Sequence, residues 1–185
     1  AGAILFTIAI MVILGTHEMG HKLLADKHEV DATYPYFIPG IPFPYGIGTF
    51  GAVIKQKALP PNRDALFDIG FTGPITGFII ATIVTIIGIQ LSTYGPLNPE
   101  TPLLPVPLLF QIILMGFQPN GAGEAIMLHP VAFAGWVGMV VTMLNLVPSG
   151  MFDGGHVARS VMNDKSHKII SYMGIVFLAL IGWWT

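Results

Sequence analysis

Residues 3–25 read AILFTIAIMVILGTHEMGHKLLA, a long apolar run whose second half carries the sequence THEMGH. About 20 helical residues cross the hydrocarbon core of a bilayer, so this run is long enough to span a membrane. It contains His17 and His21, four residues apart, and Glu18 follows the first of them. On an α-helix, side chains four positions apart lie one above the other, so both imidazoles can face one point. The stretch therefore predicts a membrane helix that carries a pair of metal-binding histidines.

The whole chain has the composition of a membrane protein. Of its 185 residues, 53% are hydrophobic and only 10% are charged, against roughly 25% charged in an ordinary soluble domain. So few charges cannot cover a water-facing surface, and we expect a lipid bilayer around the chain. The net charge of -2 offers no basic patch for phosphates, so nucleic acid is not an expected partner. Because the chain has no cysteine, any metal must be bound by His, Asp or Glu.

Three further apolar stretches, at residues 65–91, 129–147 and 169–184, are long enough to span or nearly span a bilayer. The sequence therefore predicts an all-α polytopic membrane protein with about four transmembrane helices, and residues 1–185 are expected to form one domain. The chain opens at Ala1 inside an apolar run, without the basic region of a signal peptide. This start leaves open that an upstream helix is missing.

The connections between these stretches have their own character. Residues 30–62 are rich in Pro and Gly, and GTFGAVIK at 48–55 has the β-branched and aromatic content of a strand. We expect a small membrane-associated β-strand or hairpin there. The apolar run at 103–117 is too short for a span and is interrupted by Pro105 and Pro107, so it is expected to be re-entrant or interfacial.

The distribution of positive charge predicts the membrane topology. All eight Lys and Arg residues fall within 22–63 or 159–168, and residues 92–128 contain none. Cytoplasmic connections of membrane proteins carry the excess of Lys and Arg, so the first two regions are expected to be cytoplasmic. Four spans satisfy this assignment, whereas a fifth span at 103–117 would move the positive residues at 159–168 to the outside. The ends of the first and third helices then meet near the cytoplasmic side, and the active site is expected there.

The HEMGH pattern at residues 17–21 has two interpretations, a catalytic zinc site and a pair of histidines without a chemical role. Two stacked histidines can bind one zinc ion, and Glu18 is then close enough to take a proton from the attacking water without being a ligand. The alternative is a pair of surface histidines on a soluble helix, but ionisable residues inside an apolar span are costly and usually functional. Gly73 and Gly77 favour close packing of the second helix, and in our interpretation the partner is the helix that carries HEMGH.

Two histidines do not complete a catalytic zinc site, which normally has a third protein ligand and one open position. The acidic and histidine side chains that could serve are Asp26, Glu29, Asp68, Glu124, His129, Asp153 and His156. Glu124 and His129 fall at the opposite membrane face in the predicted topology. Asp26 and Glu29 follow the histidine pair too closely and are expected in solvent beside lysines. Asp68 opens the second helix, where a carboxylate favours the helix dipole.

Asp153 is the strongest candidate for the third ligand. It stands at the end of the third helix in the sequence NLVPSGMFDGGH, residues 145–156. The two glycines after it allow a sharp turn and a close backbone approach. Alternatively, Asp153 could cap the N-terminus of a short helix at 154–162. We expect His156 to support a ligand or to pack rather than to bind the metal.

These motifs resemble the site-2 protease family of intramembrane zinc metalloproteases. The resemblance rests on HEMGH at 17–21 early in the chain, and on NLVP at 145–148 followed by DGG at 153–155. The sequences GTFG at 48–51 and GFTGP at 70–74 are similar to the branch found in archaea and plastids.

The resemblance implies roles for individual residues. His17, His21 and Asp153 would bind Zn²⁺, and Glu18 would be the catalytic base. Asn145 matches a family asparagine near the metal that orients substrate or stabilises the oxyanion. The family usually has Leu before the aspartate, whereas this chain has Phe152, an apolar change that could reshape the neighbouring pocket.

The expected function is that of an intramembrane zinc endopeptidase acting within or near transmembrane segments of membrane proteins, as in regulated intramembrane proteolysis. Those segments and the lipid bilayer are the expected partners, and the oligomeric state is not predicted. The strand at 48–54 could pair with an unwound substrate, or it could serve packing alone. Two other classes stay open. A metal transporter would distribute ligands along a pathway, and a non-catalytic membrane scaffold would not need Glu18.

Overall fold

The computed structural model describes residues 2–41, 49–96, 106–117, 124–150 and 152–184. The helices are α1 (Gly2–Lys27), α2 (Arg63–Gln90), α3 (Leu108–Met115), α4 (Pro130–Asn145), α5 (Asp153–Val161) and α6 (Asp164–Trp184). The strands form two antiparallel pairs: the hairpin of β1 (Tyr36–Pro39) with β2 (Thr49–Val53), and β3 (Thr93–Pro96) with β4 (Glu124–Met127), between which α3 intervenes in the chain. The chain is mostly helical with small sheets, as the sequence predicts.

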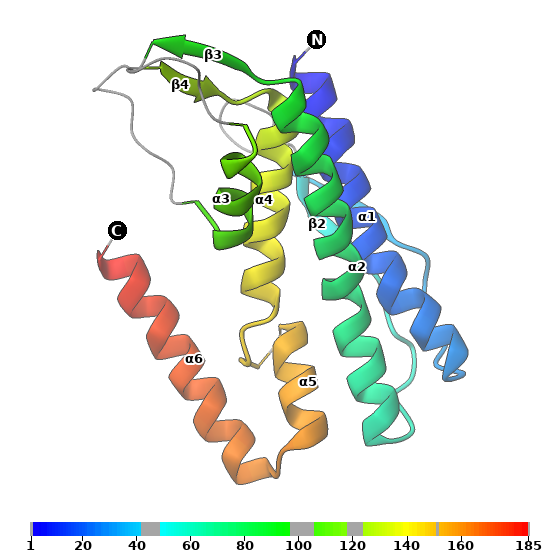
Figure 1. Ribbon diagram of the computed structural model, residues 1–185. Helices are drawn as coiled ribbons and strands as arrows, with labels where there is room; N and C mark the ends of the chain where they lie inside the picture. The colour runs from blue at the N-terminus through cyan, green and yellow to red at the C-terminus, as the bar shows by residue number, and fades with distance from the viewer. Residues whose placement is uncertain (1, 42–48, 97–105, 118–123, 151, 185) are drawn as a thin grey trace.

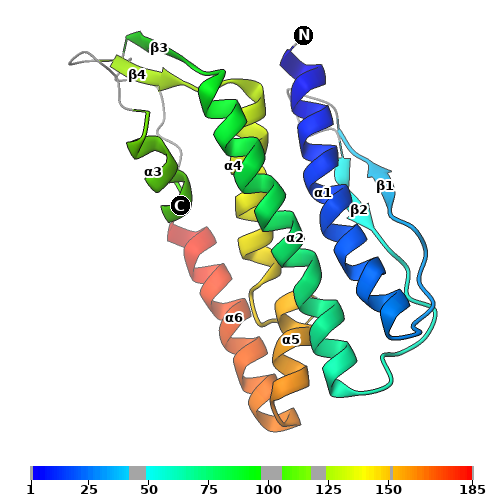
Figure 2. The same ribbon diagram turned by 45° about the vertical axis from the view of Figure 1, so that its right-hand side comes forward.

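Helices α1, α2 and α4 pack together along their lengths and form the centre of the molecule (Figures 1 and 2). α1 and α4 run in one direction and α2 runs in the other, so the C-terminal ends of α1 and α4 point the same way. Ile10 and Ile13 of α1 and Met139 of α4 are almost completely buried between the helices. The order of directions agrees with the alternation predicted from charge.

Small residues let α2 and α4 approach each other closely. A Cβ atom added at Gly88 would lie 2.1 Å from the backbone nitrogen of Ala132, and one at Gly135 would lie 2.2 Å from Oγ1 of Thr85. The backbones of α2 and α4 therefore touch at these glycines, and the close approach gives extensive van der Waals packing between the two helices. Helix starts are also specified locally, because Asn62 Oδ1 accepts a hydrogen bond from Ala65 N at the start of α2.

The two strand pairs lie at different places on this bundle. The β1–β2 hairpin lies beside α1 (Figure 2), and Ala52 is buried in one cluster with Leu14 and Val137. The strand predicted at 48–55 is confirmed as β2, although Gly48 lies outside the described residues. The β3–β4 pair lies at the far end of α2 and α4 (Figure 1) and was not predicted. Its short strands have mixed composition and no clear alternation.

The predicted spans are found as helices of unequal length. α1 and α2 are long and apolar enough to cross a membrane, and α4 is a shorter apolar helix. The count of four transmembrane helices therefore stays a prediction. The predicted re-entrant run appears as the eight-residue α3, and its first residues, 103–105, lie outside the described part. α6 stands apart from the three-helix centre and packs against α5 (Figure 1).

Replacing Gly88 by Ala should destabilise the α2–α4 contact, because the new methyl group meets the backbone of Ala132, which cannot rotate away. We expect a loss of about 1–3 kcal/mol in the free energy of unfolding, measured by denaturation in detergent followed by circular dichroism. Gly116→Ala is the matched control, since its Cβ would meet no atom closer than 3.5 Å. Equal stability of the two variants would contradict the packing argument.

Candidate metal centre

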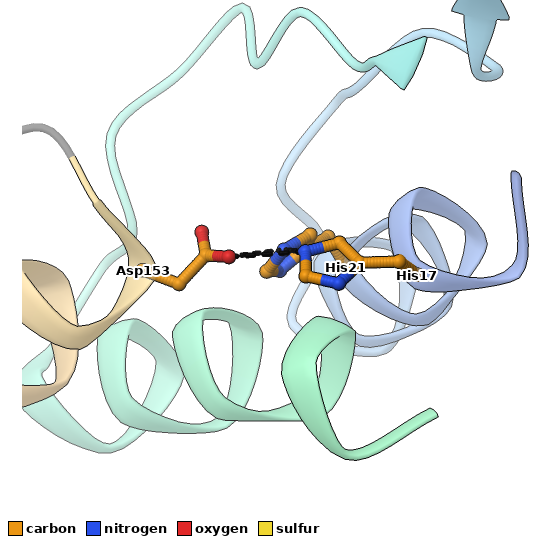
Figure 3. A group of neighbouring side chains, drawn as sticks. All are labelled: His17, His21 and Asp153. Atoms are coloured by element: carbon orange, nitrogen blue, oxygen red, sulfur yellow. Dashed lines mark hydrogen bonds and ion pairs between the residues drawn. The ribbon is translucent and has the colours of Figure 1, made fainter. Parts of the chain in front are cut away.

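Three side chains from two distant parts of the chain converge on one point (Figure 3). His17 Nε2 lies 3.0 Å from Asp153 Oδ2, His21 Nε2 lies 3.3 Å from the same oxygen, and the two nitrogens are 3.2 Å apart. His17 and His21 are 3% and 6% exposed, and Asp153 is half-buried. Among the described residues, this is the one group of three potential ligands close enough to hold a single ion.

Helix α1 places both histidines on its inner face. They are one helical turn apart, as the spacing predicts, and they face α2 where that helix has Gly73 and Gly77. A Cβ atom at Gly73 would overlap the His21 ring at 2.1 Å, and one at Gly77 would lie 2.8 Å from Nδ1 of His17. The predicted packing of these glycines against the HEMGH helix is confirmed. The glycines leave the space that the two rings occupy.

Asp153 reaches the histidines because the chain turns sharply after α4. A Cβ atom at Gly154 would lie 2.2 Å from the carbonyl oxygen of Leu146, and one at Gly155 would lie 2.8 Å from that of Ser149. Only glycine allows the start of α5 to rest so closely on this turn. The N-cap residue of α5 is Phe152, and Asp153 is its first helical residue. The alternative role of Asp153 as the N-cap is therefore wrong.

The charge state of Asp153 suits a metal ligand. Burial acts to raise the pKa of its carboxyl group, but the hydrogen bonds and charges of His17 and His21 outweigh burial and hold that pKa well below its usual range. Asp153 is therefore a carboxylate near neutral pH, and metal ligands must be deprotonated.

His21 is held by a contact that the sequence reasoning missed. Its Nδ1 lies 2.6 Å from the carbonyl oxygen of Ile69 on α2. A carbonyl oxygen can only accept, so Nδ1 carries the hydrogen, and the lone pair with which the ring can bind a metal is the one at Nε2. That lone pair faces the Asp153 oxygen, and two electron-rich atoms at this distance require a cation or a proton between them. No sequence pattern marks a backbone carbonyl as a partner, so only the packed structure could reveal it.

The spacing of the three donors fits zinc. With zinc–nitrogen distances of about 2.0–2.1 Å, the corners of a tetrahedron lie about 3.3 Å apart, and the donor atoms here are separated by 3.0–3.3 Å. Two imidazoles and a carboxylate are ligands that zinc accepts, with one position left for water or substrate. In such sites the nitrogen of a histidine ligand that does not bind the metal usually donates a hydrogen bond, often to a backbone carbonyl, as His21 does here.

The comparison with known proteins agrees with this geometry. The sequence profile of peptidase family M50 matches residues 5–181. The chain belongs to family M50. This is the site-2 protease family that the motifs resemble.

Several plant proteins are similar over nearly the whole chain. The "Probable zinc metalloprotease EGY1, chloroplastic" of Arabidopsis thaliana is 31% identical over 92% of this chain and 32% of its own length. The protein of the same name from Oryza sativa subsp. japonica is 32% identical over 90% of this chain and 29% of its length. "Probable zinc metalloprotease EGY2, chloroplastic" of Arabidopsis thaliana is 27% identical over 91% and 30%. The chain thus spans about a third of the length of these curated relatives.

Two cavities meet this M50 site. The larger, about 640 Å³, is lined by residues of α1, α2 and α5 and by the chain after β2. The smaller, about 260 Å³, is lined by α1, β2, the end of α4 and the start of α5. Glu18 and Asp153 line both cavities. Asn145 lines the smaller one, and its Nδ2 lies 3.5 Å from His17 Nε2. Phe152 also lines the smaller cavity, so the departure from the family pattern does border the site.

The structure places the other candidate ligands away from the three donors. His129 is the N-cap of α4 and Glu124 lies in β4, both at the far end of the bundle (Figure 1), as the predicted topology requires. Asp68 does not lie in the first turn of α2, and it binds His28 at 2.8 Å. The role predicted for Asp68 at the helix dipole is therefore wrong.

The remaining candidates lie nearer to the site. Asp26 and Glu29 are exposed, as expected, although Lys22, which donates a hydrogen bond to Asp26, is buried. Glu29 follows the end of α1 with a positive φ of 59°. His156 lines the larger cavity but is not one of the three donors. Asp153 thus remains the best candidate for the third ligand.

Replacing Gly73 by Ala should weaken zinc binding, because the methyl group would displace the His21 ring from Ile69 and from Asp153. We expect a loss of affinity of about tenfold or more, as for other contacts that orient a ligand, measured by competition with a chelating dye. Gly70→Ala, one turn earlier on α2, meets His156 Cβ at 3.3 Å instead of a ligand ring and should bind zinc nearly as well as the parent.

Proposed function

We propose that this chain is the core of a zinc endopeptidase that hydrolyses peptide bonds within or near transmembrane segments of membrane proteins. The observation that carries the proposal is the convergence of His17, His21 and Asp153 beside Glu18, within a bundle whose helices α1 and α2 are of membrane length. Family membership and the names of the relatives support the same chemistry.

Glu18 is the general base of the proposed reaction. Zinc, when bound by the three donors, supplies a Lewis acid that makes water acidic enough to lose a proton near neutral pH and that polarises the scissile carbonyl. Glu18 is half-buried beside the donors and lines both cavities, so it can reach water and substrate. It takes the proton as the water oxygen attacks the carbonyl carbon, and it gives the proton to the leaving amine when the C–N bond breaks.

Asn145 stabilises the oxyanion or orients the substrate. It is the last residue of α4 and lines the smaller cavity together with Glu18 and Asp153. Its amide can donate a hydrogen bond to an oxygen that becomes negative during the attack, an interaction that is strong in a site with little water.

We place this reaction at the membrane. α1 and α2 carry outward-facing apolar side chains, such as Ile4 and Ile8 on α1 and Ile79 and Ile83 on α2, which are 47–65% exposed. A bilayer covers such surfaces at no cost in hydration. Four transmembrane helices in one domain, with the active site towards the cytoplasmic side, remain our proposal from span lengths and the positions of Lys and Arg. Regulated intramembrane proteolysis is the process that this arrangement suits.

β2 offers an edge with which an unwound substrate could pair. A transmembrane substrate has its amides engaged in helical hydrogen bonds, so it must unwind before it is cut. Among the described residues, β2 pairs with β1 alone in a sheet of two strands, and Gly51 and Ala52 line the smaller cavity with Glu18. Addition of the substrate as a third strand would supply the lost hydrogen bonds next to the metal.

Glu18→Gln and Asp153→Ala separate the proposed enzyme from its alternatives. We expect Glu18→Gln to bind zinc as the parent does and to lose roughly 10²–10⁴-fold in cleavage rate, because the amide cannot accept the proton. Asp153→Ala should lose zinc and activity together. Metal analysis and cleavage of a single-span substrate in detergent measure both. A metal transporter or a scaffold would show no cleavage in the parent, and full activity of Glu18→Gln would rule out the mechanism.

Ala52→Pro and Val53→Pro form a matched pair that tests strand addition. Neighbouring residues of a strand point their N–H groups to opposite edges, so one proline removes a bond to β1 and the other removes a donor from the free edge. The proline that replaces the residue whose N–H points to the free edge should lower the cleavage rate. Thermal stability and zinc content should stay near the parent values in that variant. The other proline should lower stability. If both variants cleaved at the parent rate, the hairpin would have a packing role only.

A further inference from the structure

The larger cavity differs in chemistry from one end to the other. Its end at the metal centre is lined by Glu18, His21 and Asp153, whereas Asn62, Arg63 and Arg159 line it elsewhere. Among the described residues, Glu18 and Asp153 are the only carboxylates in its wall. Both belong to the proposed catalytic site, so the part of the cavity away from the metal carries positive charge without acidic neighbours in the wall.

Helix α5 connects these two parts. Asp153, His156 and Arg159 follow one another at intervals of three residues and all line the cavity, as expected for positions on one face of a helix. With a rise of 1.5 Å per residue, Arg159 lies about 9 Å along the axis from the metal ligand. An extended peptide covers about 3.3–3.6 Å per residue, so this distance corresponds to about three residues of bound substrate.

The two arginines have donor capacity left for a ligand. Arginine is always protonated and carries five N–H donors. None of the ion pairs among the described residues includes Arg63 or Arg159, and Arg63 Nη1 makes one long contact of 3.4 Å to the carbonyl oxygen of Met162. Asn62 uses its Oδ1 to cap α2, which leaves its NH₂ group as a further donor. All three side chains therefore favour an acceptor with negative charge.

We propose that Arg159 and Arg63 bind an acidic side chain of the substrate, about three residues from the cleaved bond. This inference rests on the proposed proteolytic function and adds a specificity to it. A carboxylate accepts paired hydrogen bonds from arginine, and the wall of the cavity between its two ends includes apolar side chains, among them Leu66 and Ile69. The site would select substrates whose cleaved segment borders Asp or Glu.

A peptide suits this cavity better than an anionic lipid. The cavity is continuous with Glu18 and Asp153, so whatever fills it adjoins the bond that is attacked. A lipid headgroup there would exclude the substrate from the catalytic base. The arginines are exposed, so their positive charge also attracts an acidic segment as it approaches.

The test measures binding without turnover. Zinc-loaded Glu18→Gln protein in neutral detergent is titrated with fluorescent peptides from a cleaved single-span substrate, carrying Glu or Gln two to four residues to either side of the bond. We expect one Glu position to bind roughly 5-fold more tightly than its Gln counterpart, which is the upper end of the effect for exposed ion pairs. Arg159→Gln and Arg63→Gln should each reduce this preference and together abolish it. Lys165→Gln, an exposed cation outside the cavity, should retain it.

Several results would overturn the proposal. Equal affinity for Glu and Gln at every position, or an equal loss of preference in Lys165→Gln, would remove the carboxylate site while zinc content and parental cleavage still supported the protease. A parent that neither binds zinc nor cleaves would remove the proposed function itself. If the arginine variants lost affinity for phosphatidylglycerol bicelles, and no acidic preference existed for peptides, the arginines would bind lipid instead.

Discussion

The close contact between α2 and the two histidine rings of α1 is the constraint on which the rest of the site depends. Gly73 and Gly77 leave room for His21 and His17, and the carbonyl oxygen of Ile69 accepts the Nδ1 hydrogen of His21. α2 therefore excludes other ring positions and determines which nitrogen faces the metal. A pair of histidines on an isolated helix would have the spacing for zinc but no fixed orientation, and fixed ligands are what a metal site requires.

The third donor depends on a second close contact, between the start of α5 and the turn after α4. Gly154 and Gly155 allow the two backbones to touch, and this turns the carboxylate of Asp153 towards α1. The site thus joins α1, α2 and α5, which contact one another closely at glycines. In a membrane, lipid tails do not drive helices together, so small residues and close van der Waals contact must hold them. Stability and chemistry here rest on the same glycines.

The two cavities bring different residues to the three donors. The smaller one brings the edge of β2 and Asn145 near Glu18, while the larger one extends to Arg63 and Arg159. A substrate held at both would have its backbone ordered by the strand and its flanking charge recognised by the arginines. Binding energy from parts of a substrate that do not react can position the bond that does.

Much of this could be predicted from the sequence, because local patterns determined it. The spacing of His17 and His21 places both on one face of a helix, and the apolar runs predict long helices. The distribution of Lys and Arg excludes His129 as a metal ligand, because it places this residue at the far end of the bundle. The pairing of β3 with β4, the pairing of Asp68 with His28 and the role of the Ile69 carbonyl could not be predicted from it. Each depends on which backbone or side chain meets another after packing, and sequence spacing carries no record of that. The sequence alone thus determined the ligand types, and the tertiary structure decided how they converge, because only packed helices bring residues 136 positions apart within one coordination sphere.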